Sequence, residues 1–297
     1  MTLTIPSDAL EAVTHVLAAH TGGLVLDDES VARLRVYLPM GAELRERLAA
    51  LRSDLTRLEA FFPGMGALGW GEGVVDERDW AEAWRAHFHP VRIGRRLVIA
   101  PTWEVPRTFA GEVVLRLDPG MAFGTGTHAS TVLCLEALET LAPGKDHGVD
   151  VGTGSGILAV AAVLLGADRV TACDLDPVAV RVAKENAGIN GVTGRVEVRY
   201  AALGDMLAAG CRPADWVVAN LTADVLTGLA PDLVRCIRPG GLVVASGIVA
   251  SGRAQVVASF TAAGLDVRRI ANLQGWYAVW AERSSRERLH AVTRPVT

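Results

Sequence analysis

Two hydrophobic periods divide residues 1–72 into short elements. Leu34, Val36 and Leu38 alternate with polar neighbours, which predicts a strand with one solvent-exposed face. Leucines recur at steps of four and three across residues 44–58, which predicts an amphipathic helix. The other predicted elements are a helix capped by Ser7 and strands at residues 3–5, 24–26 and 67–71. The resulting order, β-α-β-β-α-β, is typical of a small ferredoxin-like α+β domain.

The pattern changes after this first domain. Trp80 and Trp84 lie four residues apart in an acidic segment, so they share one face of a predicted helix. We therefore interpret residues 73–90 as a packed linker that contains a short helix. Across residues 91–281, short apolar runs alternate with helical periods, which predicts a Rossmann-like doubly wound α/β sheet. The polar tail, residues 282–297, has no periodic apolar face and is predicted to fray.

The most informative stretch is Asp-Val-Gly-Thr-Gly-Ser-Gly at residues 150–156, between a predicted strand and a predicted helix. Gly152, Gly154 and Gly156 permit a tight turn and a close approach of the backbone to a ligand. The unpaired N–H groups at the start of the helix face the same place. Asp174, at the end of the next predicted strand, is placed to accept hydrogen bonds from ribose hydroxyls. This pattern predicts a nucleotide-type ligand.

The glycine spacing favours one kind of ligand over another. A dinucleotide fingerprint has its third glycine three positions after the second, and that position is Ile157 here. Asp150 is unsuited to a pyrophosphate, whereas its charge favours a cofactor that carries an ammonium group. The turn therefore favours S-adenosylmethionine. A dinucleotide, or a structural turn without a ligand, is the alternative.

Two more stretches bear polar groups suited to a binding site. The glycine-rich residues 118–131 precede a predicted helix, and a loop in that position is a candidate anion site. Within it Thr131 offers a hydroxyl, and His128 is interpreted as a helix cap and not as a catalytic base. A predicted buried strand ends at Asn220. Since ligands bind at the carboxyl ends of strands in open α/β sheets, we expect Asn220, Asp174 and the glycine turn at one edge.

Composition and charge narrow the function classes. Half of the residues are hydrophobic and 21% are charged, as in folded globular proteins. The net charge is −4, and residues 1–72 hold six arginines against ten acidic residues. This balance disfavours direct nucleic-acid binding and favours docking of a basic protein. The longest apolar run is too short to span a membrane, and without a secretory signal we expect a cytoplasmic protein. The four scattered cysteines are predicted to be reduced core residues, with no metal-type pair.

Three of these segments together resemble one family. They are residues 118–131 with their Ala-Phe-Gly-Thr-Gly-Thr-His core, the turn at residues 150–156, and Val-Ala-Asn-Leu-Thr-Ala at residues 218–223. They are similar to the PrmA family, the methyltransferases of ribosomal large-subunit protein eleven. The resemblance covers residues 76–281 well and residues 1–72 only in the order of elements.

This resemblance implies a class I methyltransferase fold and a protein-lysine N-methyltransferase that uses S-adenosylmethionine. The implied substrate is ribosomal protein eleven, docked by residues 1–72, and we expect a monomer. Asn220 is the implied catalytic residue, beside the transferable methyl group, where its carbonyl can accept a hydrogen bond from the substrate amine. Asp205 is a further candidate for a contact with adenine. The cofactor-binding residues that the resemblance implies are Thr131, Gly152, Gly154, Asp174 and Asn220.

Three alternative functions remain open on the residues alone. A methyltransferase acting on another protein lysine or on a small molecule would keep the same cofactor site. An NAD-type oxidoreductase is disfavoured by Ile157. A non-enzymatic RNA-binding protein is disfavoured by the acidic first domain, in whose central predicted strands Tyr37 is the one aromatic residue, because such modules stack bases on aromatic side chains.

Overall fold

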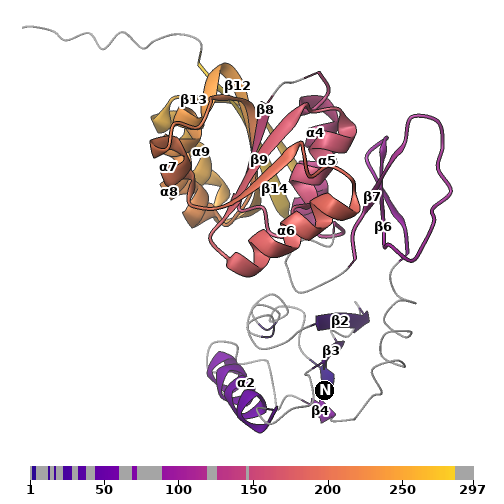
Figure 1. Ribbon diagram of the computed structural model, residues 1–297. Helices are drawn as coiled ribbons and strands as arrows, with labels where there is room; N and C mark the ends of the chain where they lie inside the picture. The colour runs from indigo at the N-terminus through magenta and orange to yellow at the C-terminus, as the bar shows by residue number, and fades with distance from the viewer. Residues whose placement is uncertain are drawn as a thin grey trace, which may run out of the picture. The chain divides into compact units, whose positions relative to one another are not determined.

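The computed structural model describes residues 2–4, 13, 17, 23–28, 33–37, 44–59, 69–71, 89–118, 126–144 and 147–284. The chain divides into two compact units, Met1–Phe88 and His89–Thr297, each with its own sheet (Figure 1). Most of the predicted linker and most of the predicted tail lie outside the described residues. Within the described part, no helix is long and apolar enough to cross a membrane.

The first unit contains a four-stranded antiparallel sheet in the order β2-β3-β1-β4. Its helix α2 buries Leu51 and Leu55 completely, which confirms the leucine period. Val13 and Leu17, in the first predicted helix, are helical and fully buried. The first strand lies between the third and the fourth, as a ferredoxin-like order requires. The elements are β1 (Thr2–Thr4), β2 (Gly23–Asp28), β3 (Arg33–Tyr37), α2 (Leu44–Glu59) and β4 (Gly69–Gly71).

The second unit is built on a seven-stranded sheet in the order β10-β9-β8-β11-β12-β14-β13. Strands β8 to β12 pair in parallel, and β14 is antiparallel to both β12 and β13. This arrangement confirms the predicted doubly wound fold. The strands are β8 (His147–Val151), β9 (Arg169–Asp174), β10 (Val196–Tyr200), β11 (Ala214–Asn220), β12 (Ile237–Val249), β13 (Leu265–Leu273) and β14 (Trp276–Arg283).

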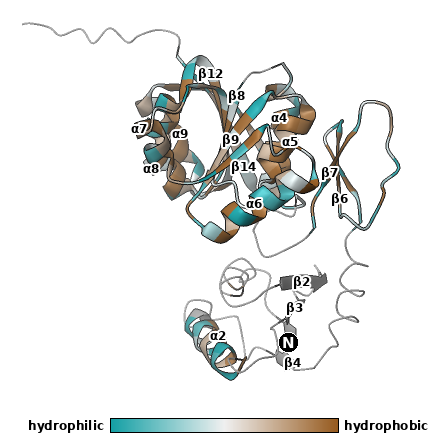
Figure 2. Cartoon of the chain, in the orientation of Figure 1, coloured by the Kyte–Doolittle hydropathy of each residue, from teal (hydrophilic) through white to brown (hydrophobic). Residues whose placement is uncertain are grey.

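Helices cover both faces of this sheet. Side chains of α4, α5 and α6 belong to one buried apolar cluster and those of α7, α8 and α9 to another, so the unit has three layers (Figure 1). Apolar residues predominate along α4 and α5 (Figure 2). The helices are α4 (Ala129–Leu141), α5 (Ile157–Leu165), α6 (Pro177–Ile189), α7 (Leu203–Ala208), α8 (Ala223–Cys236) and α9 (Arg253–Ala263).

A small sheet is fastened to these helices by side-chain bonds to its backbone. Glu139 of α4 accepts hydrogen bonds from the N–H groups of Arg95 and Arg96, at 2.9 and 2.7 Å. The Asn190 amide accepts from the Arg116 N–H at 2.7 Å and donates to the Arg116 carbonyl at 2.8 Å. The sheet is therefore held at its first turn and at its last strand. Its strands are β5 (Val91–Ile93), β6 (Leu97–Ala100) and β7 (Val113–Arg116).

We predict that Glu139→Ala lowers the free energy of unfolding of the second unit by about 2 kcal/mol, because two backbone donors lose a charged acceptor. Hydrogen exchange at the Arg95 and Arg96 amides should accelerate as well. Glu136→Ala is the matched control, since Glu136 is exposed on the same helix. Unchanged exchange at both amides in the Glu139 variant would contradict this account of the turn.

Candidate functional site

The strand order reverses between β8 and β11, and this reversal fixes where a ligand can bind. The chain proceeds outward from β8 to β9 and β10, and then returns to pair β11 on the other side of β8. In such sheets a crevice opens outside the carboxyl ends of the two central strands. Val151 at the end of β8 pairs with Ala219. Asn220, the last residue of β11, therefore lies beside Gly152, the residue that follows Val151.

The glycine turn after β8 depends on backbone that only glycine adopts easily. Gly152, Gly154 and Gly156 have φ angles of 70°, 54° and 80°, in the left-handed region. A Cβ on Gly152 would lie 2.5 Å from Leu221 Cδ2, and one on Gly156 would lie 2.9 Å from Ala183 Cβ. Because Gly152 and Gly156 have no Cβ, the turn packs closely against Leu221, which follows β11, and against α6. The predicted turn is present, and it forms the base of the candidate site.

Asp174 ends β9 next to this turn and has a second role that the sequence did not predict. Its Oδ2 accepts the Gly154 N–H at 2.9 Å, and its Oδ1 accepts the Asp176 N–H at 3.0 Å. The carboxylate therefore braces the glycine turn. Each carboxylate oxygen keeps further acceptor capacity, and the side chain is partly exposed. Asp174 can hold the turn and accept ribose hydroxyls at the same time.

Asn220 is joined to Thr131 across 89 positions of sequence. The Asn220 Nδ2 donates to the Thr131 Oγ1 at 3.2 Å, and Thr131 is only 1% exposed. On the other side of the amide, a Cβ on Gly247 would lie 3.0 Å from Asn220 Oδ1. One of the two N–H donors of the amide is used by Thr131, and its carbonyl oxygen remains an acceptor that can face a substrate.

Asp150 lies beneath the turn and does not reach a ligand directly, because its side chain is 0% exposed. Its Oδ2 accepts from the Thr153 hydroxyl at 2.6 Å and from the Ala159 N–H at 3.2 Å. Among the described residues, its Oδ1 has no hydrogen-bond partner. Burial raises the pKa of the Asp150 carboxyl to about 7, although these two hydrogen bonds lower it. The charge expected from the sequence is therefore only partly present at pH 7, and it can act on a ligand only through its field.

The start of α4 confirms the interpretation of His128 as a helix cap. The His128 Nδ1 accepts the Ser130 N–H at 3.3 Å. Its ring also lies edge-on to the Trp276 ring of β14, with centroids 4.6 Å apart. The helix that carries Thr131 is therefore fixed at its first turn. Residues 119–125 of the predicted glycine-rich loop lie outside the described residues.

Asp205 is used locally by its own helix. Its Oδ2 accepts the Ala202 N–H at 3.4 Å, which closes the N-terminus of α7 as a carboxylate at that position commonly does. The side chain is exposed. This geometry gives Asp205 a capping role, and it leaves a contact with adenine without support.

Two exposed apolar side chains flank Asp174 that the sequence interpretation missed. Leu175 is 68% exposed and Tyr200 is 64% exposed, and Tyr200 pairs with Asp174 in the register of β9 and β10. Exposed apolar surface beside a carboxylate that can accept ribose hydroxyls suits a planar base. The sequence signal for this surface is the apolar Leu175 directly after the acidic residue that ends β9. Together with the glycine turn, these side chains fit the cofactor that the sequence predicts.

The family and the relatives that match this chain carry the same description. The family described as "Ribosomal protein L11 methyltransferase (PrmA)" matches residues 3–284. A ribosomal protein L11 methyltransferase from Heliobacterium modesticaldum is 44% identical over 256 residues, which cover 86% of this chain and 80% of that protein. One from Pelotomaculum thermopropionicum is 41% identical over 292 residues, covering 90% and 92%. The crystal structure of a ribosomal protein L11 methylase from Lactobacillus delbrueckii subsp. bulgaricus is 32% identical, with a TM-score of 0.61. Its alignment covers 66% of this chain and all of that one.

We predict that the cofactor-free protein loses stability through Asp150 as the pH rises from about 4 to about 7. The folded carboxyl has a raised pKa, so in this range the folded state binds a proton that the unfolded state has released. The expected loss is about 1.4 kcal/mol per pH unit. Denaturant unfolding at pH 5.5 and pH 7.5 measures it.

The Asp150→Asn variant supplies the comparison for this prediction. Asparagine keeps an acceptor for Thr153 and Ala159 but does not titrate. The variant should lose less stability than the parent between the two pH values, since all other titrating groups are shared. An identical pH dependence in both proteins would show that folding does not raise the pKa of Asp150.

Proposed function

We propose that this chain, which belongs to the PrmA family of ribosomal protein L11 methyltransferases, methylates amino groups of ribosomal protein L11. The methyl donor is S-adenosylmethionine. The family membership predicted from the sequence motifs is confirmed by the match over residues 3–284. The main support for the proposal is that Asn220, Thr131 and the Gly152 turn lie together where the strand order reverses. That is the place where an α/β sheet of this topology binds its ligand.

The residues at this edge fit the parts of the cofactor in turn. The Gly152 turn would take the methionine part, and the Thr131 hydroxyl would bond its polar end. Asp174 would accept the ribose hydroxyls, and Leu175 and Tyr200 would cover the adenine ring. Bound S-adenosylmethionine supplies a methyl group already activated on a sulfonium, so the protein must align an amine and exclude water.

Asn220 is the residue that we assign to the substrate amine. A lysine ammonium has a pKa of about 10.4 and must lose a proton before it can act as a nucleophile. Partial desolvation of the site favours the neutral amine, and a hydrogen-bond acceptor orients it. The Asn220 carbonyl can serve as this acceptor, since Thr131 occupies the other end of the amide. Alignment and desolvation of the amine then promote the methyl transfer. The acceptor amines are those of lysine side chains or the α-amine.

Residues 1–72 are proposed to recognise the substrate. Their excess of acidic residues over arginine suits a basic ribosomal protein. The two innermost strands of their sheet, β3 and β1, hold Tyr37 as their one aromatic residue, so they lack the stacking platform of an RNA-binding module. We propose a monomer that acts in the cytoplasm, without direct binding to nucleic acid.

We predict that Asn220→Ala lowers kcat for methylation of ribosomal protein L11 by about 100-fold, the effect of removing one well-placed hydrogen-bonding group from a reacting centre. The melting temperature should change by only about 2 °C. Thr131→Val should have a smaller effect on kcat because it loosens the amide, and Thr131→Ser should restore activity. A loss of stability that parallels the loss of activity would show that Asn220 has only a structural role.

We predict that a chain starting at His89 binds S-adenosylmethionine with unchanged affinity but methylates full-length ribosomal protein L11 at least about 100-fold more slowly, because docking supplies the effective concentration of the amine. A short lysine peptide is the control substrate, and both chains should methylate it equally slowly. Mass spectrometry of the product identifies the amines. Full activity of the shortened chain on ribosomal protein L11 would favour a different substrate.

A further inference from the structure

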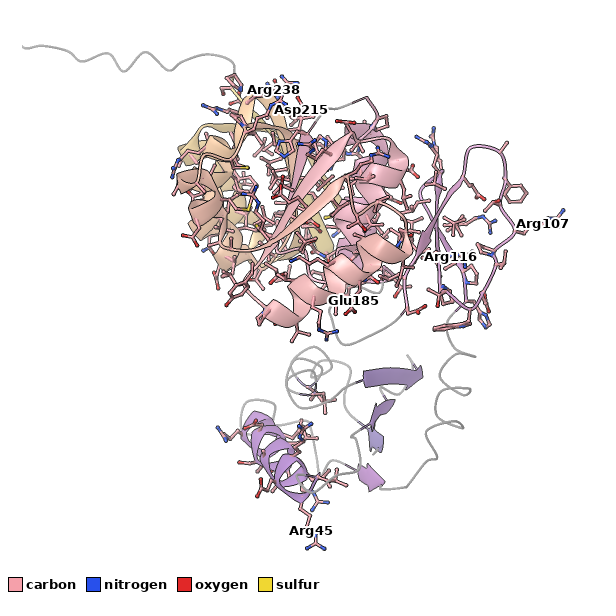
Figure 3. All side chains as sticks on the ribbon, viewed as in Figure 1. Arg45, Arg107, Arg116, Glu185, Asp215 and Arg238 are labelled. Carbon is pink, nitrogen blue, oxygen red and sulfur yellow. The ribbon has the colours of Figure 1, made fainter. Side chains whose placement is uncertain are left out.

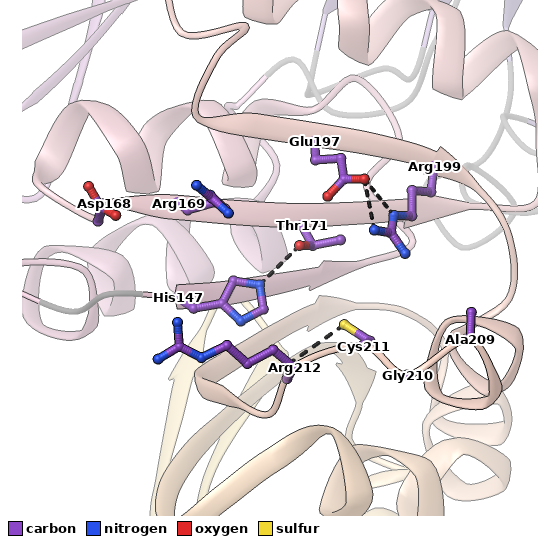
Figure 4. Close-up of a pocket in the computed structure, with 10 residues that line it drawn as sticks. All are labelled: His147, Asp168, Arg169, Thr171, Glu197, Arg199, Ala209, Gly210, Cys211 and Arg212. Carbon is purple, nitrogen blue, oxygen red and sulfur yellow. Dashed lines mark hydrogen bonds and ion pairs between the residues drawn. The ribbon is translucent and has the colours of Figure 1, made fainter.

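A recess opens at the opposite end of the same strands, away from the cofactor edge. It has a volume of about 360 Å³ and is lined by residues of β8, β9 and β10 and of the segment that follows α7 (Figure 4). The helix after β10, α7, is only six residues long, so this part of the sheet face is not covered by a helix. The residues that matter for its chemistry are His147, Arg169, Thr171, Arg199, Cys211 and Arg212.

The floor of the recess is a fixed polar pair. His147 is 7% exposed and Thr171 is 3% exposed, and the His147 Nε2 lies 2.9 Å from the Thr171 Oγ1. His147 also pairs with Arg169 in the register of β8 and β9. Side chains two residues apart on a strand share a face, so Arg169 and Thr171 border the same hollow. A few fixed polar groups orient the ligand in a binding site, and this floor supplies two of them.

Positive charge predominates among the groups around this floor. Within the described residues, the guanidinium groups of Arg169 and Arg212 have no carboxylate partner, whereas Arg199 is paired with Glu197 at 2.8 Å. Asp168 lies at the outer end of the row, beyond Arg169 (Figure 4). The two unpaired arginines therefore remain available to an anion.

The carboxylate of Asp215, which contacts the His147 backbone, is already paired with an arginine. Asp215 accepts the His147 backbone N–H at 3.0 Å and the Arg238 guanidinium at 2.6 Å, a pair that Figure 3 shows side by side. Burial lowers the pKa of His147, and so do the nearby charges of Arg212 and Arg169. The imidazole is thus neutral at pH 7, and both guanidinium groups act on the same small region.

We propose that this recess binds the phosphoryl group of a small phosphorylated molecule, or free phosphate, through Arg169 and Arg212. Planar guanidinium donors from two different elements suit the oxygens of a phosphoryl group. The volume is within the range of small-molecule sites. The acidic side chains of Asp168 and Glu197 at the rim oppose a long polyanion, which disfavours RNA as the occupant. The site shares no residue with the cofactor edge and goes beyond the proposed methyl transfer.

Calorimetric titration of the full chain at constant ionic strength tests this inference. The probes are inorganic phosphate and ribose 5-phosphate, which carries no adenine that could enter the cofactor site. At least one should bind, and Arg169→Gln and Arg212→Gln should each weaken that binding about tenfold or more. Arg181→Gln is the matched control, because Arg181 is an exposed arginine on α6 paired with Glu185, and it should leave the affinity unchanged.

The outcomes separate the source of the phosphoryl group and can overturn the proposal. Tighter binding of ribose 5-phosphate supports a phosphorylated metabolite, and binding of inorganic phosphate alone supports the free ion. The proposal fails if neither probe binds at about 10 mM, or if the control variant loses as much affinity as the other two. It also fails if an oligoribonucleotide binds these arginines in preference to both probes. Thermal melts confirm that the variants are folded.

Discussion

The end of β11 is held between two glycines, Gly152 and Gly247, and the candidate active site depends on this constraint. A Cβ on Gly152, after β8, would lie 2.5 Å from Leu221 Cδ2, and one on Gly247, in β12, would lie 2.5 Å from the Leu221 carbonyl oxygen. Both glycines have left-handed backbone, with φ of 70° and 84°. A methyl group at either position would push Leu221, and with it Asn220, out of place. The glycine turn and the Asn220 amide are thus positioned by contacts with the same residue, Leu221.

The parts of the site that follow from local sequence could be predicted. The glycine turn, the helix cap at His128 and the strands that end at Asp174 and Asn220 each depend on a few neighbouring residues. The rule that ligands gather at carboxyl ends then placed three distant segments at one edge. The Thr131–Asn220 hydrogen bond agrees with that placement, because it joins two residues that were assigned to the edge separately.

Other features depend on contacts that no local pattern encodes. The bonds from Asp174 to the Gly154 and Asp176 amides require the folded turn. Pro239 and the two glycines after it lie within β12, as a bulge opposite the start of β11. Cys211 was predicted to be a core residue but is half-buried at the recess, because α7 is too short to cover it. In each case, the length or the pairing of a neighbouring element decides the outcome.

Strand β9 carries charges of opposite sign at its two ends, and these charges give the two edges of the sheet different selectivities. Arg169 begins the strand and Asp174 ends it, about 16 Å apart at the usual rise per residue. This distance exceeds the Debye length of about 8 Å at physiological ionic strength, so the two edges act as nearly independent electrostatic sites. A cationic cofactor is attracted to the acidic edge and repelled by the arginines, and a phosphorylated ligand experiences the reverse.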